Sequence, residues 1–528
     1  MNAIFLTQST SLGMFFRLME ALREPLGLER VGFYVTDSVE YDRFAHACPE
    51  IESGEYRVLK EWEILRAASG REPDMELIRS YESEIGDPDL WGAVVCDRWL
   101  SLGRRCIYRQ DYGRRYTHGE LLAILSEGLS RIDRFLDAVK PDVIFSFICV
   151  TFGEYITYLM SRLRGIPFLN LRPTRIRDFV FFGEGIFEPS RYLVDRYKDY
   201  RKGRGGERWL REAAMYIDSV RTGHAMYEGV IPPSRRAPRV VKSRRSLYSR
   251  TMDKLRHTGG YLMGRYRNDN QYPGVWSPLL YRSFINPLRG AYTNAVLRKH
   301  HLTERDLDGM EYAFYPLHKE PEVTMMVYSR RHLNQIEVVR NFASSIPVGM
   351  KLVVKEHPAS VGWRSPGFYR KLLDIPNVCI AEPSIVSKRL IENARLVAIT
   401  AGSIGLESLL LGKPVVSLGN CPFNILPDSM IRNVKILEGL GEEVSALLNG
   451  YSYDEGAMKS YVAAVMDCGT RVNLYSMLLG KRGVYTVDPA RGGIEDEIEK
   501  LAKYAVRRVR EESAAQGVGS GEWKTGSR

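Results

Sequence analysis

The sequence predicts an α/β fold made of two doubly wound, Rossmann-like domains. Between residues 351 and 419, short apolar runs rich in β-branched residues alternate with segments long enough for helices. This alternation is typical of a parallel sheet covered by helices. The chain also opens with a strand, a turn, a helix and a strand, which is how a doubly wound domain begins. With 528 residues, 44% of them apolar, it can bury the cores of two or three domains.

The first domain is expected to span residues 1–187. Its strands and helices are predicted at Ala3–Thr7, Met14–Arg23, Val31–Thr36, Leu121–Leu136, Asp142–Phe147, Gly153–Leu163 and Pro167–Leu171. The apolar residues of the long helix recur with helical spacing, whereas the strands are short apolar runs bounded by turn residues. Because ligands collect beyond the carboxyl ends of parallel strands, the loops after these strands are candidate sites.

A connector is expected over residues 188–308, helical as far as Ile231 and basic beyond it. From Ile231 to His300 there are 15 Lys and Arg residues, whereas Asp253 and Asp269 are the acids. Since the formal charge of the whole chain is +11, the rest of it is close to neutral. A solvated linker and docking to the anionic inner membrane surface both fit residues 231–300. No nucleic-acid partner is expected, because no recognised binding module is present.

The second domain is expected to span residues 309–490. Its strands are predicted at Tyr312–Leu317, Leu352–Val354, Val378–Ala381, Leu396–Thr400 and Val415–Leu418, with helices at Arg331–Ile346, Phe368–Leu373, Ser387–Ala394 and Ile404–Leu411. A final helix is predicted within residues 491–515, where acids lead and arginines trail, as the helix dipole favours. The Gly- and Ser-rich residues 516–528 are expected to be a disordered tail.

A glycine-rich turn follows the strand at Leu396–Thr400. Gly402 and Gly405 permit a sharp turn and a close approach by a ligand, and Ser403 can cap the next helix. The free N–H groups at the start of that helix favour an anion such as phosphate. Glu407 lies one turn further on, where its carboxylate can accept hydrogen bonds from ribose hydroxyls. An ordinary strand–turn–helix connection is the simpler interpretation of the glycine pair alone.

A second polar cluster, Lys355, Glu356, His357 and Pro358, follows the strand at Leu352–Val354. The proline stops the strand from continuing. A histidine in this position is often a structural residue. Here, however, Lys355 and His357 are expected to share one edge of the sheet with the glycine-rich turn, and this grouping suits a phosphate ester.

Three motifs occur in order along the chain: Pro316–Glu322, Val354–Pro358 and Gly402–Glu407. Together they resemble the motifs of the capsule polysaccharide biosynthesis family, which includes the Kdo transferases of bacterial capsule assembly. The resemblance implies a GT-B fold, in which two Rossmann-like domains face a cleft. It also implies transfer from a nucleotide-activated sugar, which is CMP-Kdo in the best-known members.

The resemblance further implies how these motifs bind a nucleotide sugar. His357 and Ser403 would contact the nucleotide phosphate, and Glu407 would contact the ribose. The expected donor-site residues are His318, Glu322, Lys355, Glu356, His357, Pro358, Gly402, Ser403, Gly405 and Glu407. No metal and no further cofactor is expected, because protein groups take the place of an ion at the phosphate.

A transferase also needs a carboxylate near the anomeric carbon, as a base or as a nucleophile. Glu154, which opens a predicted helix, and Asp178, which ends a basic loop, are the candidates, with Asp97 as a third. Taken singly, each is more readily explained as a helix-end acid or as a member of a surface ion pair.

The sequence favours a cytoplasmic location, in solution or peripheral on the membrane. No secretory signal opens the chain, and no run of about 18 apolar residues occurs. The seven cysteines are scattered without a CxxC pair, as in a protein with reduced thiols.

The resulting hypothesis is a glycosyltransferase of surface or capsular polysaccharide biosynthesis. It would transfer Kdo or a similar acidic sugar from a CMP donor to a glycan or glycolipid acceptor. A nucleotide-sugar epimerase of the same architecture is one alternative, recognised by release of an epimerised sugar without an acceptor. A non-catalytic polysaccharide assembly or export factor is the other, recognised by nucleotide binding without turnover.

Overall fold

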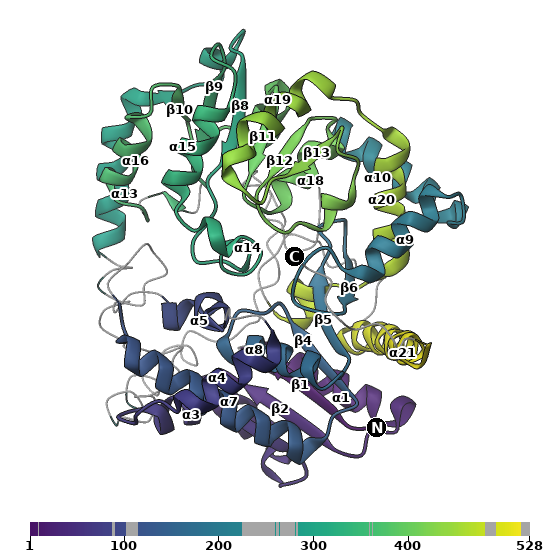
Figure 1. The fold of residues 1–528 in the computed structure, drawn as a ribbon. Coiled ribbons are helices and arrows are strands. Elements are labelled where there is room, and N and C mark those ends of the chain that lie inside the picture. Colours follow the sequence, from purple (N-terminus) through teal and green to yellow (C-terminus); the bar gives the residue numbers. More distant parts are fainter. Residues whose placement is uncertain are drawn as a thin grey trace.

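The structure, a computed structural model, contains two β-sheets, and helices pack on each of them (Figure 1). It describes residues 1–8, 10–86, 90–101, 114–223, 259, 263, 280, 284–357, 360–361, 363–480 and 493–518. Within these ranges each of the two sheets has seven strands. The predicted α/β fold with two Rossmann-like domains is confirmed.

The first sheet has the strand order β14-β6-β5-β4-β1-β2-β3. Its strands are β1 (Ala3–Thr7), β2 (Val31–Val35), β3 (Arg57–Lys60), β4 (Val143–Phe147), β5 (Phe168–Pro173), β6 (Phe179–Gly183) and β14 (Thr470–Arg471). Strand β1 pairs in parallel with β2 on one side and with β4 on the other. The chain therefore changes direction across the sheet between β1 and β4, and this is where a ligand crevice is expected.

Helices cover both faces of this sheet, so every residue of β1, β2 and β4 is buried. They are α1 (Ser11–Leu26), α2 (Ser38–Ala47), α3 (Glu61–Ala68), α4 (Met75–Ile85), α5 (Trp91–Cys96), α6 (Arg98–Ser101), α7 (His118–Val139) and α8 (Phe152–Leu163). Helices α7 and α8 each begin with a capping box, in which a threonine and a glutamate satisfy the first free N–H groups.

The second sheet is entirely parallel, with the order β13-β12-β11-β8-β9-β10-β7. Its strands are β7 (His301–Leu302), β8 (Tyr312–Pro316), β9 (Lys351–Lys355), β10 (Val378–Ala381), β11 (Leu396–Ile399), β12 (Val415–Ser417) and β13 (Ile431–Asn433). The five predicted strands form its centre. The two edge strands were not predicted, because two or three residues leave no recognisable periodic pattern.

The helices of the second domain are α13 (Asn286–Leu297), α14 (Val323–Met326), α15 (Gln335–Ser345), α16 (Pro366–Leu373), α17 (Ser387–Asn393), α18 (Ser403–Leu410), α19 (Leu440–Gly450) and α20 (Glu455–Cys468). The four helices predicted between residues 331 and 411 correspond to α15, α16, α17 and α18, whereas the other four were not predicted. A short 3₁₀ turn, η5 (Arg330–His332), connects α14 to α15. Figure 1 shows α14 facing α5 of the first domain, and these two helices are in contact.

Several elements cross the predicted domain boundaries. Helices α9 (Arg191–Arg201) and α10 (Glu207–Thr222), from the predicted connector, pack on α20 of the second domain. Strand β14 then joins the first sheet, and α21 (Ile494–Val518) packs on α1. The Tyr504 hydroxyl of α21 accepts a hydrogen bond from the Phe182 backbone at 3.1 Å, so the end of the chain is tied to the first domain.

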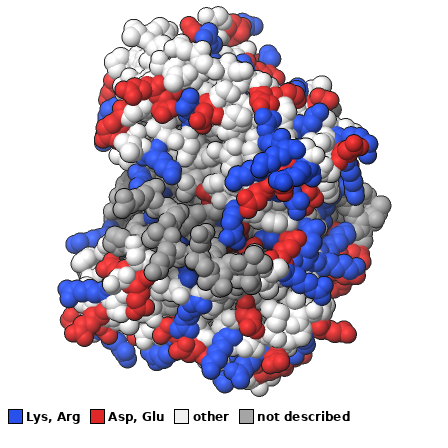
Figure 2. All heavy atoms as spheres, turned by 45° about the vertical axis from the view of Figure 1, so that its right-hand side comes forward, with Lys and Arg blue, Asp and Glu red and all other residues white. Residues whose placement is uncertain are grey.

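The remaining predictions concern the connector and the tail. Most of the basic stretch 231–300 and residues 519–528 lie outside the described residues. Figure 2 shows Lys and Arg side chains interspersed with Asp and Glu on the face that bears α9, α10 and α21. Ion pairs such as Arg196–Asp467 and Arg201–Asp454 neutralise part of this face. None of the helices in the described ranges is long and apolar enough to cross a membrane.

Candidate functional site

The topology of the second sheet brings the three motif loops together. Strand β8 lies at the centre, with β9 on one side and β11 on the other. From β8 the chain builds the sheet outward through β9 and β10, and it then returns to β11 on the opposite side. The loops that follow β8, β9 and β11 are therefore neighbours at the carboxyl edge, at the point where parallel sheets bind ligands.

The loops after β8 and β11 approach each other at His318 and Gly402. A Cβ atom placed on Gly402 would lie 3.6 Å from Cε1 of His318 and 3.4 Å from Cγ2 of Thr324. Gly402 has a φ of 114°, which L side chains rarely adopt. The glycine is thus required by the backbone conformation, and it also leaves the imidazole uncovered on that side.

His318 is half-buried, and the Nε2 atom of its imidazole is buried. Its Nε2 atom has no hydrogen-bond partner among the described residues. Burial lowers the pKa of His318 to about 3, and the positive charge of Arg364 lowers it further. The ring is therefore neutral at pH 7 and can donate or accept a hydrogen bond. An unsatisfied buried nitrogen at the edge of a sheet is consistent with a ligand contact.

Gln335, the first residue of α15, holds the backbone of His318 from both sides. Its Oε1 atom accepts a hydrogen bond from His318 N at 2.7 Å, and its Nε2 donates to His318 O at 3.0 Å. The same Nε2 donates to Glu320. Arg364, which is 3% exposed at its side chain, also donates to His318 O. These two residues fix the loop after β8, and sequence reasoning did not identify either of them.

Glu356 acts as an internal brace in this structure. One carboxylate oxygen accepts a hydrogen bond from His357 N at 2.7 Å. The other accepts from Arg364 and, at 2.7 Å, from the Tyr369 hydroxyl. Because both oxygens are used inside the protein, Glu356 supports the loop after β9 and connects it through Arg364 to the loop after β8.

Lys355, which is buried, and Glu407, which is half-buried, carry opposite charges that attract each other. The Lys355 ammonium group donates a hydrogen bond to Ser387 Oγ at 3.2 Å. Burial lowers the pKa of Lys355 to about 8, against the opposing attraction of Glu407 and Glu356. Burial likewise raises the pKa of Glu407, although Lys388 and Lys355 act in the opposite direction. The Glu407 carboxylate forms no hydrogen bond within the described part of the chain.

His357 is exposed at the end of β9, whereas Pro358 lies outside the described residues. Partial burial lowers the pKa of His357, and the nearby cations Lys319, Lys355 and Arg364 lower it further against the attraction of Glu356. The imidazole is thus accessible to a ligand in a region of positive charge.

Glu322 lies at the junction between the two domains. Its carboxylate pairs with Lys319 at 3.6 Å. Burial raises the pKa of Glu322, and the charges of Lys319, Arg175 and Arg98 lower it. Since Arg98 and Arg175 belong to the first domain, cations from that domain reach the motif loop after β8.

The glycine-rich turn differs from its predicted roles in two ways. Gly402, rather than Ser403, is the N-cap of α18, and Ser403 is the first residue of the helix. Gly405 lies inside α18, where a Cβ would come within 2.5 Å of Ile399 and 2.7 Å of Phe423. Gly405 therefore permits tight packing of the helix against the sheet and does not form part of the turn.

Glu154 is completely buried at the start of α8. Its carboxylate accepts hydrogen bonds from Val150 N at 2.9 Å, from Thr151 N at 3.2 Å and from the Gln8 side chain at 3.0 Å. Burial raises the pKa of Glu154 to about 8. The residue thus caps a helix, and it can also hold a proton near neutral pH. Asp97, also fully buried, accepts hydrogen bonds from Trp99 N, Leu100 N and Phe152 N.

Asp178 lies in the turn between β5 and β6. Its side chain is buried and pairs with Arg471 of β14 at 2.8 Å. The Asp178 carbonyl also accepts a hydrogen bond from Val472 N at 2.9 Å. Asp178 therefore anchors the returning strand on the first sheet, a role that the sequence could not indicate because β14 is 293 residues away.

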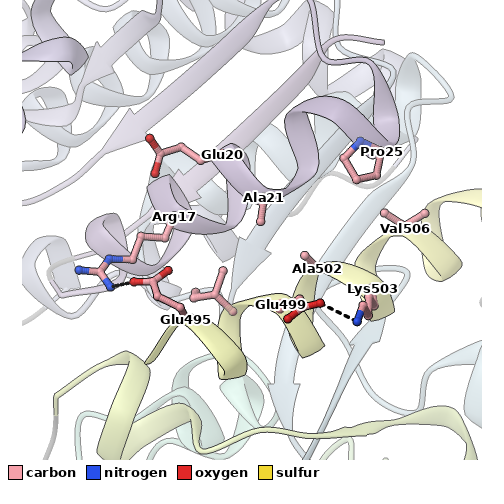
Figure 3. Close-up of a pocket in the computed structure, with 10 residues that line it drawn as sticks. Arg17, Glu20, Ala21, Pro25, Glu495, Glu499, Ala502, Lys503 and Val506 are labelled. Atoms are coloured by element: carbon pink, nitrogen blue, oxygen red, sulfur yellow. Dashed lines mark hydrogen bonds and ion pairs between the residues drawn. The ribbon is translucent and has the colours of Figure 1, made fainter. Parts of the chain in front are cut away.

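A groove of about 580 Å³ lies elsewhere, between α1 and α21 on the outside of the first domain (Figure 3). Arg17 points toward Glu495 and Lys503 toward Glu499, and both ion pairs measure 2.6 Å. None of the predicted site residues lines this groove. In the described ranges, no group of three or more His, Cys, Asp or Glu side chains is arranged to hold a metal ion.

Residues 327–427 match the family model described as capsule polysaccharide biosynthesis protein. The resemblance predicted from the motifs is confirmed over this segment, which contains the loops after β9 and β11. Protein FixF of Sinorhizobium fredii (strain NBRC 101917 / NGR234) is 33% identical over 121 residues. These residues are 22% of this chain and 28% of that protein, so the alignment spans less than a third of this relative.

Two solved structures are among those to which this chain is similar. The β-Kdo 2,7 transferase KpsC of Thermosulfurimonas dismutans is 12% identical, with a TM-score of 0.34 over 71% of this chain and 89% of that one. The UDP-GlcNAc 2-epimerase of Neisseria meningitidis, solved with UDP-GlcNAc, is 12% identical and has a TM-score of 0.27. The match covers 96% of this chain and 100% of that one.

Proposed function

We propose that this protein is a glycosyltransferase of surface or capsular polysaccharide biosynthesis, and that it binds its nucleotide-sugar donor at the carboxyl edge of the second sheet. One observation carries the proposal. The loops after β8, β9 and β11 meet at this edge, two of them inside the segment that matches the capsule family. There His318 approaches Gly402, and Lys355 lies beside Glu407.

The donor phosphate would lie at the N-terminus of α18. Ser403 and the first free N–H groups of the helix are available to an anion there, and Gly402 keeps the approach open. His357 is exposed at the neighbouring strand end, among the cations Lys319 and Lys355. Stabilising the charge that develops on the leaving phosphate would be the main catalytic contribution of these groups.

The nucleoside would extend toward Glu407. Its carboxylate has no hydrogen bond within the described residues and can accept from the ribose hydroxyls. The sugar would then point toward the first domain, where Arg98 and Arg175 lie near Glu322. Two arginines at that position suit a sugar that carries a carboxylate, and this supports a CMP-linked acidic sugar such as Kdo.

The acceptor, a glycan or a glycolipid, would enter from the first domain. Glu154 is the proposed catalytic carboxylate, because a pKa of about 8 suits proton transfer at neutral pH. Asp178 remains the second candidate, although its ion pair with Arg471 must open first. The proposed location is the cytoplasmic side of the inner membrane, and the reaction is proposed to need no metal or further cofactor.

Transfer from CMP-Kdo to a glycolipid acceptor, followed by CMP release, tests the proposal. His357→Ala and Ser403→Ala should each lower kcat/KM by roughly 100-fold, as when a donor to a developing negative charge is removed. His46→Ala, which replaces an exposed histidine of α2, is the matched control and should retain wild-type activity. Unchanged turnover in His357→Ala would contradict the assigned role. Release of an epimerised sugar in the absence of an acceptor would show that the protein is an epimerase. Nucleotide binding without any turnover would show that it is an assembly factor.

A further inference from the structure

Helix α13 presents an apolar stripe to solvent. Phe284, just before the helix, is 61% exposed, Leu288 is 70% exposed and Tyr292 is 54% exposed. The three residues are spaced by four, so they lie on one side of a helical segment. Leu280, four residues earlier, is also 51% exposed. Single exposed apolar residues are common, but an aligned series of large ones indicates a surface that something covers.

The opposite side of α13 packs on its own domain. Asn286, Thr293 and Leu297 are buried, and α13 contacts α16. Figure 1 shows α13 beside α16 at the outer left of the second domain. The helix is therefore held in place by the buried side, and the apolar stripe remains accessible without any rearrangement of the fold.

Several basic residues on α13, on the turn after it and on the neighbouring α16 have no acidic partner among the described residues. Arg289, Arg298 and Lys299 belong to α13 or the turn that follows it, and Arg370 and Lys371 are exposed on α16. None of the five forms an ion pair with another described residue. Asp374, at the end of α16, is an exposed acid close to them in sequence. From residue 270 to residue 303 the sequence contains no Asp or Glu at all.

The basic face of α9 and α10 makes a useful contrast. There Arg196, Arg201 and Arg221 pair with acids of α20 or of the residues just before it. Those charges are satisfied within the protein, whereas the charges around α13 are available to an external anionic surface. Apolar side chains flanked by unpaired basic ones are the combination with which a helix lies in the interface of an anionic bilayer.

We propose that α13 docks this protein on an anionic lipid bilayer, with Phe284, Leu288 and Tyr292 entering the interface and Arg289, Arg298 and Lys299 contacting lipid headgroups. The assignment rests on the proposed function only insofar as a glycolipid acceptor would be found at such a surface. It narrows the membrane contact from residues 231–300 to one described helix. It also predicts binding that does not depend on donor or acceptor.

Co-sedimentation of the full chain with vesicles tests the assignment. Vesicles of phosphatidylcholine mixed with phosphatidylglycerol should bind the wild type, and phosphatidylcholine alone should bind it much less. The triple variant Phe284→Ser, Leu288→Ser, Tyr292→Ser should lower the partition coefficient by at least about tenfold. The triple variant Arg289→Gln, Arg298→Gln, Lys299→Gln should lower binding to the anionic vesicles and weaken its dependence on salt.

A matched control changes exposed apolar residues elsewhere in the same domain. Val348→Ser with Ile436→Ser removes two side chains that are 103% and 69% exposed, and it should leave vesicle binding unchanged. Wild-type melting temperatures and wild-type nucleotide-induced stabilisation of each variant would show that fold and donor site are intact. A failure of the proposed transferase function would change the nucleotide measurement and leave vesicle binding in place.

Three results would overturn the docking proposal. The first is a wild-type protein that does not bind anionic vesicles. The second is a serine triple variant that binds them as well as the wild type does. The third is a wild-type dimer by light scattering that becomes a monomer in the serine variant without any vesicle binding, which would assign the stripe to a second copy of the chain.

Discussion

Arg330 of the second domain donates a hydrogen bond to the hydroxyl group of Tyr155 in the first domain. Its guanidinium group also lies 6.0 Å from the ring centres of Tyr155 and Phe187. A Cβ on Gly92 of α5 would come within 2.4 Å of Arg330 Nη1 and 2.5 Å of the Tyr155 hydroxyl. The two domains therefore interlock here, eight residues after Glu322 in the proposed donor loop.

Gly92→Ala tests how tightly this junction is packed. The added methyl group must displace Arg330 or Tyr155, and overpacking of this kind costs about 1–3 kcal/mol. The variant should therefore have a lower melting temperature than the wild type. Gly119→Ala is the control, because nothing lies within 4 Å of a Cβ at Gly119 in α7. Equal melting temperatures for Gly92→Ala and the wild type would show that the junction is packed loosely enough to accommodate the added methyl group.

Gly402→Ala tests whether the glycine-rich turn serves the donor site as well as the fold. Both glycines have positive φ, so an alanine should cost roughly 1 kcal/mol of stability at Gly412 and about 1–3 kcal/mol at Gly402, whose φ of 114° and ψ of 177° are adopted essentially by glycine alone. At Gly412 nothing lies near the added atom, whereas at Gly402 it faces His318 and Thr324.

The two variants should thus differ in nucleotide binding, measured by calorimetry. Gly402→Ala should weaken binding by at least about tenfold, since the methyl group narrows the approach to the ligand. Gly412→Ala should bind as the wild type does. If both variants bind equally well, the turn after β11 has no part in the donor site.

Much of the second domain could be predicted because its strands and helices leave strong periodic patterns. Strand β10 coincides with the predicted Val378–Ala381, and α18 lies within one residue of its predicted range. The expectation that the loops after β9 and β11 share an edge followed from the rule for parallel sheets, and the topology confirms it.

The parts that could not be predicted depend on contacts between distant residues. Gln335 holds His318 through a side-chain amide, and a single glutamine at a helix start carries no signal of that contact. The packing role of Gly405 depends on Phe423, which is on another element. Asp178 is anchored by Arg471 because a two-residue strand returns to the first sheet. Local sequence cannot indicate such pairings.

The pKa of about 8 for Lys355 predicts a pH dependence of donor binding. Burial lowers the pKa of this ammonium group, so it loses its proton as the pH rises through about 8. The affinity for a nucleotide diester or diphosphate should therefore fall above that pH, because the cationic form attracts phosphate. Lys355→Arg, which stays charged, should bind with little change between about pH 7 and pH 9. Parallel pH profiles for the two proteins would exclude Lys355 from the phosphate site.

The buried Glu154 predicts a pH dependence of stability. Its pKa of about 8 lies above the ordinary value, so the folded protein binds more protons than the unfolded chain between about pH 4.5 and pH 8. The protonated Glu154 carboxyl group makes its full contribution to the free energy of unfolding below this pH window. That contribution is lost as the pH rises through the window. The melting temperature of the wild type should therefore fall across the window relative to that of Glu154→Gln, which has no charge to bury. Identical pH profiles would mean that the carboxyl group ionises freely in the folded protein.

The central claim, a nucleotide-sugar site formed by the loops after β8, β9 and β11, is tested most directly by thermal stabilisation. The purified chain would be melted alone and with CMP, CDP, UDP, GDP and their sugars. A ligand at about 100 times its Kd adds about 2.7 kcal/mol of stability. Gln335→Ala should reduce that gain, because the His318 loop loses its clamp, whereas Asn341→Ala, on the exposed side of the same helix, should not. We predict stabilisation by cytidine nucleotides that is lost in His318→Ala and Ser403→Ala. Stabilisation by no nucleotide, or equal stabilisation of the wild type and both variants, would contradict the account.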